Sequence, residues 1–278
     1  MSAIKPPILL DCGPWHVECL CFGKGDEFLI AFHGFDNDAA DFAVFEPYLS
    51  QHYTIISVNL FFHGNSFIDG PPANAEFTAD ELNKLFTVLK KHFRSERFSL
   101  LGFSLGGRIC LSLMESHGKY IDRVFLLAPD GLRINPWYRF VTSHPVGRWL
   151  FQRVKEKPRI FLKVADILRA MRLVGEKQYR FAWAHFNTTA KRMKVYNVWM
   201  VFRQILPDID KIRQVIVRYN IRVDLIFGKR DAFIRSSHAK RLVTGITDQC
   251  RIHELETGHN LLKLEIGELI ARLMKSEK

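Results

Sequence analysis

The sequence predicts an α/β fold in which a mostly parallel sheet is covered by helices, and two observations carry this prediction. Apolar runs of strand length alternate with segments of helical periodicity, both in the first half of the chain and near its end. Parallel strands need crossover connections, and helices are the usual crossovers. Hydrophobic residues make up 47% of the 278 residues, which suits a chain with a sizeable core rather than a disordered one.

The first expected elements lie within residues 17–60. Two strand-like stretches in residues 17–32 flank a turn-forming cluster, Gly23-Lys24-Gly25-Asp26, and this arrangement predicts a hairpin. The second stretch, residues 28–32, is apolar throughout, as expected of a strand that is buried on both faces. A helix over about residues 39–51 and an apolar strand over residues 54–60 follow.

The next helix has a well-defined start. Thr78-Ala79-Asp80-Glu81 has the form of a capping box, and the apolar residues behind it recur at helical spacing to about residue 93. The remaining expected elements are a strand over 98–101, a helix over 105–116, a strand over 124–128, a strand over 223–227, a helix over 237–243, a strand over 251–255 and a helix over 261–274.

An insert interrupts this alternation after Asp130. Residues 131–220 are rich in aromatics, show mainly helical periodicity, and hold 19 Lys and Arg against 5 Asp and Glu. The rest of the chain is slightly acidic, although the whole chain carries a formal net charge of +11. The sequence therefore predicts a core domain of residues 1–130 and 221–278 and a basic, aromatic-rich helical domain of residues 131–220.

Several classes of protein are disfavoured by what the sequence lacks. No run reaches the roughly 18 apolar residues of a membrane-spanning helix, and the start of the chain, Met1 to Pro7, lacks the apolar core of a secretion signal. We therefore expect a cytoplasmic protein. The five cysteines are odd in number and lack the paired spacing of a zinc site, so we expect buried thiols, without a disulfide framework or a structural metal.

A candidate nucleophile lies between an expected strand and an expected helix. Gly102-Phe103-Ser104-Leu105-Gly106 matches the G-x-S-x-G pattern, in which a sharp turn lifts the serine hydroxyl out of the sheet. The helix that begins at Leu105 directs amide N–H groups and a positive dipole end towards this place. The alternative is a glycine-rich turn with a passive serine. Glycine spacing excludes a dinucleotide fingerprint, and no Walker lysine follows, so no cofactor is expected.

A serine nucleophile needs a base, and the base needs an orienting carboxylate. Asp231 and His259 each follow an expected strand late in the chain. Carboxyl ends of parallel strands share one edge of a sheet, so these two side chains and Ser104 are expected to meet there. Asp130 also follows a strand and is a second candidate for the acid.

At this point the sequence resembles the α/β-hydrolase superfamily over nearly its whole length. The landmarks are His33-Gly34-Phe35, His63-Gly64-Asn65-Ser66, the G-x-S-x-G match, Gly228-Lys229-Arg230-Asp231 and Gly258-His259. The resemblance implies an α/β-hydrolase fold with a Ser104, Asp231 and His259 triad, an oxyanion hole made by the backbone N–H groups of Phe35 and Leu105, and an insert that forms a cap. The sequence departs from the family pattern at two places. It has Asn59-Leu60-Phe61-Phe62 where many relatives carry an Asp and an Arg-Gly, and it has Ser236 where a proline is common.

The expected activity is hydrolysis of a carboxylic ester or thioester through an acyl-enzyme intermediate, without a metal or cofactor. A serine at the position of Ser104 disfavours the haloalkane dehalogenase and epoxide hydrolase branches, whose nucleophile is a carboxylate. His33 and His63 are expected to be structural, because no further ligand-type residues cluster with them. Two alternatives stay open: a catalytically silent binding protein of the same fold, and a lactonase, carbon–carbon bond hydrolase or cofactor-free peroxidase that uses the same triad.

The charge of the insert bears on partners. Three interpretations stay open. The positive charge would attract an anionic ester or thioester substrate, or it would hold the protein against an anionic membrane. In the third, the Lys and Arg side chains are simply solvated on outward helix faces. Binding of nucleic acid is disfavoured, because no recognisable reader motif accompanies the positive charge. The acyl chain, the leaving group and the oligomeric state are not encoded in any pattern we find.

Overall fold

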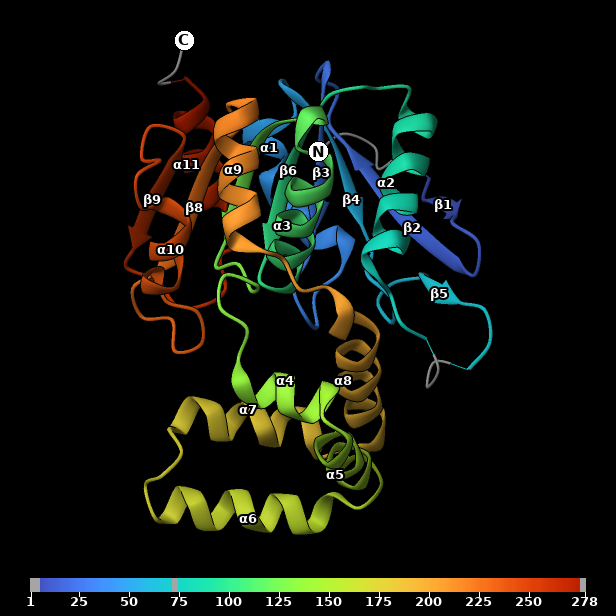
Figure 1. Ribbon diagram of the computed structural model, residues 1–278, viewed down its shortest axis with the longest axis vertical. Coiled ribbons are helices and arrows are strands. Elements are labelled where there is room, and N and C mark those ends of the chain that lie inside the picture. The colour runs from blue at the N-terminus through green and yellow to red at the C-terminus, as the bar shows by residue number, and fades with distance from the viewer. Residues whose placement is uncertain (1–5, 72–74, 276–278) are drawn as a thin grey trace. The chain divides into compact units, whose positions relative to one another are not determined.

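The computed structural model describes residues 6–71 and 75–275, and the chain divides into two compact units (Figure 1). The first unit comprises residues 1–70, 78–133 and 205–278, and the second comprises residues 71–77 and 134–204. The second unit is thus shorter at its end than the insert expected from the sequence. Helix α9 (Ile209–Tyr219), expected in the insert, packs on α3 in the first unit through a buried stripe of Ile209, Ile212 and Ile216. Residues 1–5, on which the expectation about a secretion signal partly rests, lie outside the described residues.

One sheet forms the centre of the first unit. Within the described residues it has nine strands, of which eight run in the order β1-β2-β4-β3-β6-β7-β8-β9 while β5 pairs with β2. All pairs from β4 to β9 are parallel, and the pairs made by β2 are antiparallel. The strands are β1 (Ile8–Asp11), β2 (Trp15–Phe22), β3 (Glu27–Phe32), β4 (Tyr53–Val58), β5 (Phe67–Ile68), β6 (Phe98–Phe103), β7 (Ile121–Leu127), β8 (Arg222–Gly228) and β9 (Cys250–Leu255). The predicted mostly parallel sheet is therefore confirmed.

The expected hairpin within residues 17–32 is wrong. Strand β4 lies between β2 and β3, antiparallel to the first and parallel to the second. The glycines of the connection do not form a hairpin turn. They allow the backbone of the connection to lie close to the backbone at the start of β4. A Cβ on Gly23 would lie 2.4 Å from the carbonyl oxygen of Tyr53, and a Cβ on Gly25 would lie 2.0 Å from the carbonyl carbon of His52. The connection thus passes directly over the start of β4.

Helices cover both faces of the sheet. On one side α2, α3 and α9 pack together, and on the other side η1, α1 and α11 do so (Figure 1). Residues that alternate along the strands, such as Leu29 and Ala31, pack with Phe42, Phe45 and Ile266 in a buried cluster on the second side. The helices of this unit are η1 (Ala39–Phe45), α1 (Glu46–Leu49), α2 (Ala79–Phe93), α3 (Leu105–His117), η3 (Gly118–Tyr120), α9, η5 (Ser236–Ala239), α10 (Lys240–Val243) and α11 (Leu264–Lys275).

The second unit is helical and has an aromatic core of its own. Phe151 packs against Tyr196 and Trp199, with ring centroids 5.0 and 5.5 Å apart, and Phe161 packs against Phe186 at 5.0 Å. Its helices are α4 (Pro136–Ser143), α5 (Pro145–Glu156), α6 (Pro158–Ala170), α7 (Glu176–Phe186), α8 (Thr189–Val201) and η4 (Phe202–Gln204). Three of them begin with a proline, which suits the first helical turn.

The cysteines are buried free thiols, as expected from the sequence. Burial raises the pKa of Cys12 to about 11 and that of Cys250 to about 12, so neither thiol forms a reactive thiolate at neutral pH. In the part of the chain that the structure describes, no helix is both long enough and apolar enough to cross a bilayer.

Candidate active site

Ser104 occupies a strained turn between β6 and α3. Its backbone angles, φ 51° and ψ −113°, lie in a region that L residues rarely adopt. Its N–H donates to the carbonyl oxygen of Leu127 at 2.9 Å, and its own carbonyl accepts from the N–H groups of Gly107 and Asp130 at 2.9 and 2.8 Å. The strain is therefore held by three backbone hydrogen bonds, and the turn has the geometry of a nucleophile elbow.

The glycines of the G-x-S-x-G match are required by close packing. A Cβ on Gly102 would lie 2.7 Å from the Sγ of Cys110 and from the backbone of α3. A Cβ on Gly106 would lie 1.8 Å from the carbonyl oxygen of Phe32, at the end of β3. The absence of side chains at both positions lets α3 start directly against the sheet, which fixes where Ser104 points.

Three side chains from distant parts of the sequence meet at this turn. The Nε2 atom of His259 lies 3.1 Å from the hydroxyl oxygen of Ser104. The Nδ1 atom of His259 lies 2.6 Å from Oδ2 of Asp231. Because the carboxylate only accepts, Nδ1 carries the proton and Nε2 is left to accept the hydroxyl proton of Ser104. The structure thus brings together the three residues that the sequence nominated, at the carboxyl ends of β6, β8 and β9.

The carboxylate of Asp231 is held ionised although it is buried. Burial by itself raises the pKa of this group, but the hydrogen bond and charge of His259 and the N–H groups of Phe233 and Ile234 outweigh it, so the pKa lies below its ordinary value. Both N–H groups donate to Oδ1, at 2.7 and 3.1 Å, and leave Oδ2 for the imidazole. A fixed carboxylate of this kind orients the imidazole ring.

Asp130, the other candidate acid, is engaged elsewhere. Its Oδ2 atom accepts from the guanidinium of Arg108, whose side chain is 3% exposed, and its Oδ1 atom accepts from the N–H of Gly131 at 2.7 Å. Its carboxylate therefore compensates a buried charge on α3 instead of orienting His259.

Two histidines fix the loop that carries Phe35. The Nε2 atom of His33 accepts from the N–H of Leu60 at 3.0 Å, and its Nδ1 donates to the carbonyl of Gly34 at 2.7 Å. The Nε2 atom of His63 accepts from the N–H of Asp36 at 3.2 Å, and its Nδ1 donates to the carbonyl of Phe61 at 3.0 Å. Each ring is thus a neutral tautomer that ties the loop after β3 to the loop after β4.

The second predicted oxyanion donor, Leu105, is the first residue of α3. The first N–H groups of a helix have no carbonyl of an earlier turn to bond, and they carry the positive end of the helix dipole. The chain therefore presents a backbone donor next to Ser104. The ring of Phe103 and the ring of Phe233 lie on the imidazole of His259, with centroids 5.3 and 5.8 Å away, and give the base apolar neighbours.

A buried acid that sequence reasoning missed supports the same region. Glu18 on β2 accepts from the side chain of Asn59 at 2.6 Å and from the backbone and side chain of Asn65 at 2.9 and 2.6 Å. Ser66 bonds the carbonyl of Asn59 at 2.7 Å and the N–H of Glu18 at 2.9 Å. This network occupies the place where the sequence departs from the family pattern. The signal for it was the acidic residue Glu18 in the middle of a mostly apolar strand.

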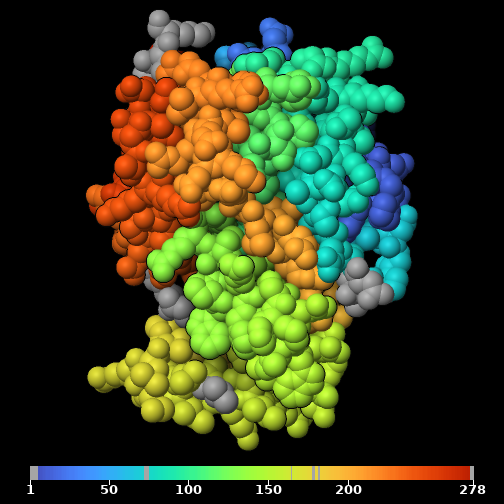
Figure 2. All heavy atoms as spheres, in the orientation of Figure 1, coloured from blue at the N-terminus to red at the C-terminus, as the bar shows by residue number. Residues whose placement is uncertain are grey.

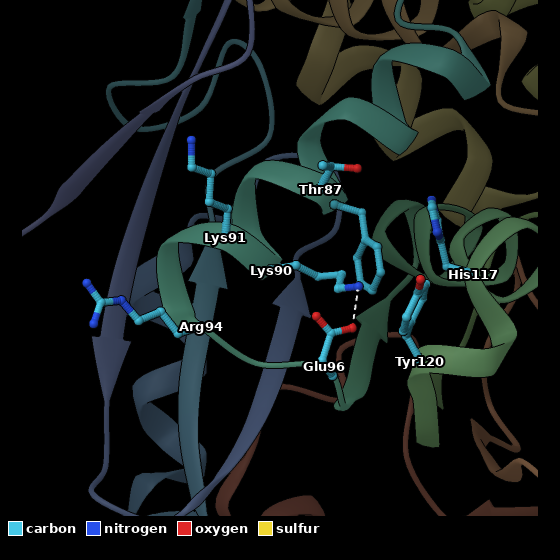
Figure 3. Close-up of a pocket in the computed structure, with 8 residues that line it drawn as sticks. Thr87, Lys90, Lys91, Arg94, Glu96, His117 and Tyr120 are labelled. Carbon is cyan, nitrogen blue, oxygen red and sulfur yellow. Dashed lines mark hydrogen bonds and ion pairs between the residues drawn. The ribbon is translucent and has the colours of Figure 1, made fainter.

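A separate hollow of about 540 Å³ lies beside α2 and shares no residue with the triad (Figure 3). It is cationic, but the ammonium of Lys90 already bonds Glu96 at 2.7 Å and lies 3.4 Å from the ring centroid of Tyr120. Lys91 and Arg94 also line the hollow, and Figure 3 shows their side chains directed away from Lys90, Glu96 and Tyr120. Across residues 6–71 and 75–275, no group of three or more His, Cys, Asp or Glu side chains is arranged to hold a metal ion.

The fold agrees with what the chain resembles. The model of the alpha/beta hydrolase fold family matches residues 28–265, so the chain belongs to the α/β-hydrolase superfamily. An uncharacterized hydrolase of Bacillus subtilis (strain 168), YugF, is 24% identical over 250 residues, which cover 89% of this chain and 88% of that protein.

Solved structures show the same fold at low identity. One is a putative epoxide hydrolase mutant from Pseudomonas aeruginosa with bound MFA, with a TM-score of 0.64 and 14% identity over 100% of this chain and 98% of the other. Another is the serine hydrolase CCSP0084 from the polyaromatic hydrocarbon-degrading bacterium Cycloclasticus zankles, with a TM-score of 0.64 and 15% identity over 98% and 97% of the two chains. At such identities the likeness is one of fold.

Proposed function

We propose that the protein is a serine hydrolase that cleaves a carboxylic ester or thioester through an acyl-enzyme intermediate. The observation that carries this proposal is the continuous path from Asp231 through His259 to the hydroxyl of Ser104, with distances of 2.6 and 3.1 Å. Both lie within the range in which a proton passes between heavy atoms. The strained backbone of Ser104 adds support, because strain of this kind is typical of an exposed nucleophile.

The proposed reaction has two halves. Nε2 of His259 removes the hydroxyl proton of Ser104 while Oγ attacks the carbonyl carbon, and the N–H groups of Leu105 and Phe35 stabilise the oxyanion. The imidazolium then gives this proton to the leaving oxygen or sulfur as the carbonyl bond to it breaks. In the second half His259 takes a proton from water, which attacks the carbonyl carbon of the acyl-enzyme. The imidazolium then returns this proton to Oγ of Ser104 as the bond from the acyl carbon to Oγ breaks, which releases the acid and restores the serine hydroxyl.

A carboxylic ester fits these groups better than an epoxide. The nucleophile at the turn is an alcohol, and an attack by an alcohol on an epoxide would leave an ether on the enzyme, which water does not hydrolyse readily under mild conditions. The likeness to a putative epoxide hydrolase therefore carries over the fold and not the reaction.

The test is labelling by a fluorophosphonate probe together with turnover of nitrophenyl esters and acyl thioesters of graded chain length. Wild-type protein should be labelled at Ser104 and turn over at least one substrate of the panel. Ser104→Ala should abolish both, while Ser112→Ala, which removes a buried hydroxyl further along α3, should retain both. Turnover that persists in Ser104→Ala would overturn the proposal, and wild-type protein that neither reacts nor turns over would favour a silent binding protein.

A further inference from the structure

The second unit carries the whole net charge of the protein. By sequence it holds 15 Lys and Arg against 4 Asp and Glu, a formal charge of +11, whereas the first unit holds 25 of each. Three of the four acids of the second unit are already used in ion pairs, for example Glu176 with Arg169 and Arg180 at 3.0 and 2.9 Å. The proposed hydrolase chemistry resides in the first unit, so the catalytic groups leave this charge unexplained.

The same unit exposes many large apolar side chains. The unit is just over a quarter of the chain, yet it contributes about half of the exposed large hydrophobic residues among the described side chains. Seven of them lie on α5, on α6 and in the turn after α6: Val146 (54% exposed), Trp149 (56%), Leu150 (42%), Ile160 (72%), Ile167 (57%), Met171 (62%) and Leu173 (66%). Exposed apolar side chains gathered in this way are typical of a surface that binds a protein, a membrane or a ligand.

The helical spacing puts these side chains on continuous stripes. On α5, Val146, Trp149 and Leu150 share one face, with the guanidinium of Arg153 next along it and 5.5 Å from the ring centroid of Trp149. The opposite face of α5 buries Phe151 in the aromatic core of the unit. The side chains of this stripe therefore take no part in the core of the unit.

Helix α6 repeats the pattern. Ile160, Lys163 and Ile167 follow at helical spacing on one exposed face, and Met171 continues it beyond the end of the helix. Another side of α6 packs on α7, where the ring centroids of Phe161 and Phe186 lie 5.0 Å apart, and Asp166, beside the exposed face, accepts from the side chains of Tyr179 and Trp183 at 2.8 and 3.1 Å. We call the exposed side chains of residues 145–173 the α5–α6 surface. This segment holds eight Lys and Arg and two Asp and Glu, and Figure 2 shows it in green to yellow on the surface of the unit.

We propose that the α5–α6 surface docks on a lipid bilayer that contains anionic lipid. Apolar side chains and Trp149 would enter the boundary between headgroups and acyl chains, and the interspersed Lys and Arg would bind the lipid phosphates. Long basic side chains suit this place, because their stems lie along apolar surface while their charged ends reach the headgroups.

Charge and shape select a bilayer over other occupants. A second copy of the chain would bring two surfaces of the same positive sign together, which opposes self-association. A small anionic ligand needs cations that converge on a hollow, whereas these cations are spread along two helices, among apolar side chains. An anionic bilayer is flat, extended and apolar behind its charge, and so matches both properties of the surface.

The test is co-sedimentation of the full chain with vesicles. We expect binding to vesicles of phosphatidylcholine and phosphatidylglycerol in equal amounts, at least tenfold weaker binding to phosphatidylcholine alone, and weakening of the first when salt rises from about 50 to about 500 mM. Ile160→Ser/Ile167→Ser and Arg159→Gln/Lys163→Gln should each weaken binding to the mixed vesicles by at least tenfold.

Matched variants of the first unit serve as controls. Leu9→Ser/Leu264→Ser removes two side chains that are 51% and 54% exposed, and Lys91→Gln/Arg94→Gln removes two exposed cations, so both should bind as wild type does. Far-ultraviolet circular dichroism and urea unfolding check that every variant is folded. Ser104→Ala should also bind as wild type, which separates this proposal from the proposed hydrolase activity.

Three results would overturn the proposal. One is the absence of binding to mixed vesicles at low salt. Another is a loss of binding in the first-unit controls that equals the loss in the α5–α6 variants. The third combines three findings: the lipid-free wild-type protein self-associates in sedimentation velocity, Ile160→Ser/Ile167→Ser abolishes this self-association, and wild-type protein does not bind vesicles. The surface would then bind a second copy of the chain.

Discussion

His63 accepts the backbone N–H of Asp36 through Nε2 at 3.2 Å, and so a side chain from the loop after β4 holds the loop after β3. Asp36 has a positive φ of 66°, so the backbone just beyond Phe35 is in a conformation that needs support. The donor that we assign to the oxyanion hole is the N–H of the neighbouring residue. The position of that donor therefore depends on an imidazole that comes from a different loop.

The first prediction concerns His63→Ala. Without its acceptor the loop after β3 is less well fixed, so kcat should fall about tenfold to a hundredfold, less than the roughly 10²–10³ lost with a whole oxyanion donor. KM should stay nearly constant, because the donor acts mainly in the transition state. His117→Ala is the control, since the imidazole of His117 is also hydrogen-bonded, to the side chain of Asn83 at 2.9 Å, but lies outside the site. An unchanged kcat in folded His63→Ala would contradict the role.

The second prediction concerns Gly106→Ala. The added Cβ would lie 1.8 Å from the carbonyl oxygen of Phe32 and 2.9 Å from that of His33, and backbone atoms cannot rotate away. We expect a loss of about 3 kcal/mol in the free energy of unfolding, the upper end for overpacking, measured by urea denaturation. Gly258→Ala is the control, because its Cβ would meet nothing within 4 Å, and it should change stability by less than about 0.5 kcal/mol. Equal stability of the two variants would refute the packing argument.

Local signals in the sequence predicted local structure well. Helix α2 starts where the capping box placed it, and the hydroxyl of Thr78 accepts from the N–H of Glu81 at 3.3 Å. The meeting of Ser104, Asp231 and His259 was also predictable, because it depends only on three parallel strands sharing an edge. Neither inference needs the identity of neighbouring strands.

Non-local pairing and buried polar contacts were not predictable. The cluster from Gly23 to Asp26 has turn chemistry whether or not the flanking strands pair, and only the insertion of β4 decides that they do not. In the same way nothing in the sequence says which backbone groups His33 and His63 bond. The apolar periodicity of helix α9 would be the same in either unit, so the sequence does not show to which unit the helix belongs. Its packing against α3 assigns it to the first unit.

The third prediction concerns Glu18→Gln. The carboxylate accepts three hydrogen bonds with its two oxygens, and an amide would turn one acceptor into a donor that faces another donor. We expect a loss of about 1–3 kcal/mol in the free energy of unfolding near neutral pH. Asp80→Asn, an exposed acid at the start of α2, should cost much less.

The pH dependence of the Glu18 variant has a definite sign. Burial raises the pKa of Glu18, but hydrogen bonds from Asn65 and Asn59 outweigh it, so the folded pKa lies below the ordinary value of 4.5. A lowered folded pKa gives stability that is complete above pH 4.5 and is lost as the pH falls through the folded pKa. The difference in stability between wild type and Glu18→Gln should therefore shrink in acid. A difference that grows in acid would contradict the assignment.

The last prediction separates the two candidate acids, Asp231 and Asp130. Asp231→Asn replaces an acceptor of the Nδ1 proton of His259 by an amide, which either favours the wrong tautomer or loses the bond of 2.6 Å. In a serine protease the corresponding change costs about 10⁴ in kcat, and we expect a loss of about 10³–10⁴ here with little change in fold. Asp130→Asn leaves the triad intact but removes the negative charge that pairs with buried Arg108, so it should lower the free energy of unfolding by about 1–3 kcal/mol while kcat of the folded fraction stays within a few-fold of wild type. Urea denaturation and single-turnover acylation of both variants, run side by side, measure the two effects separately. The opposite pattern, a stable but inactive Asp130→Asn, would make Asp130 the acid.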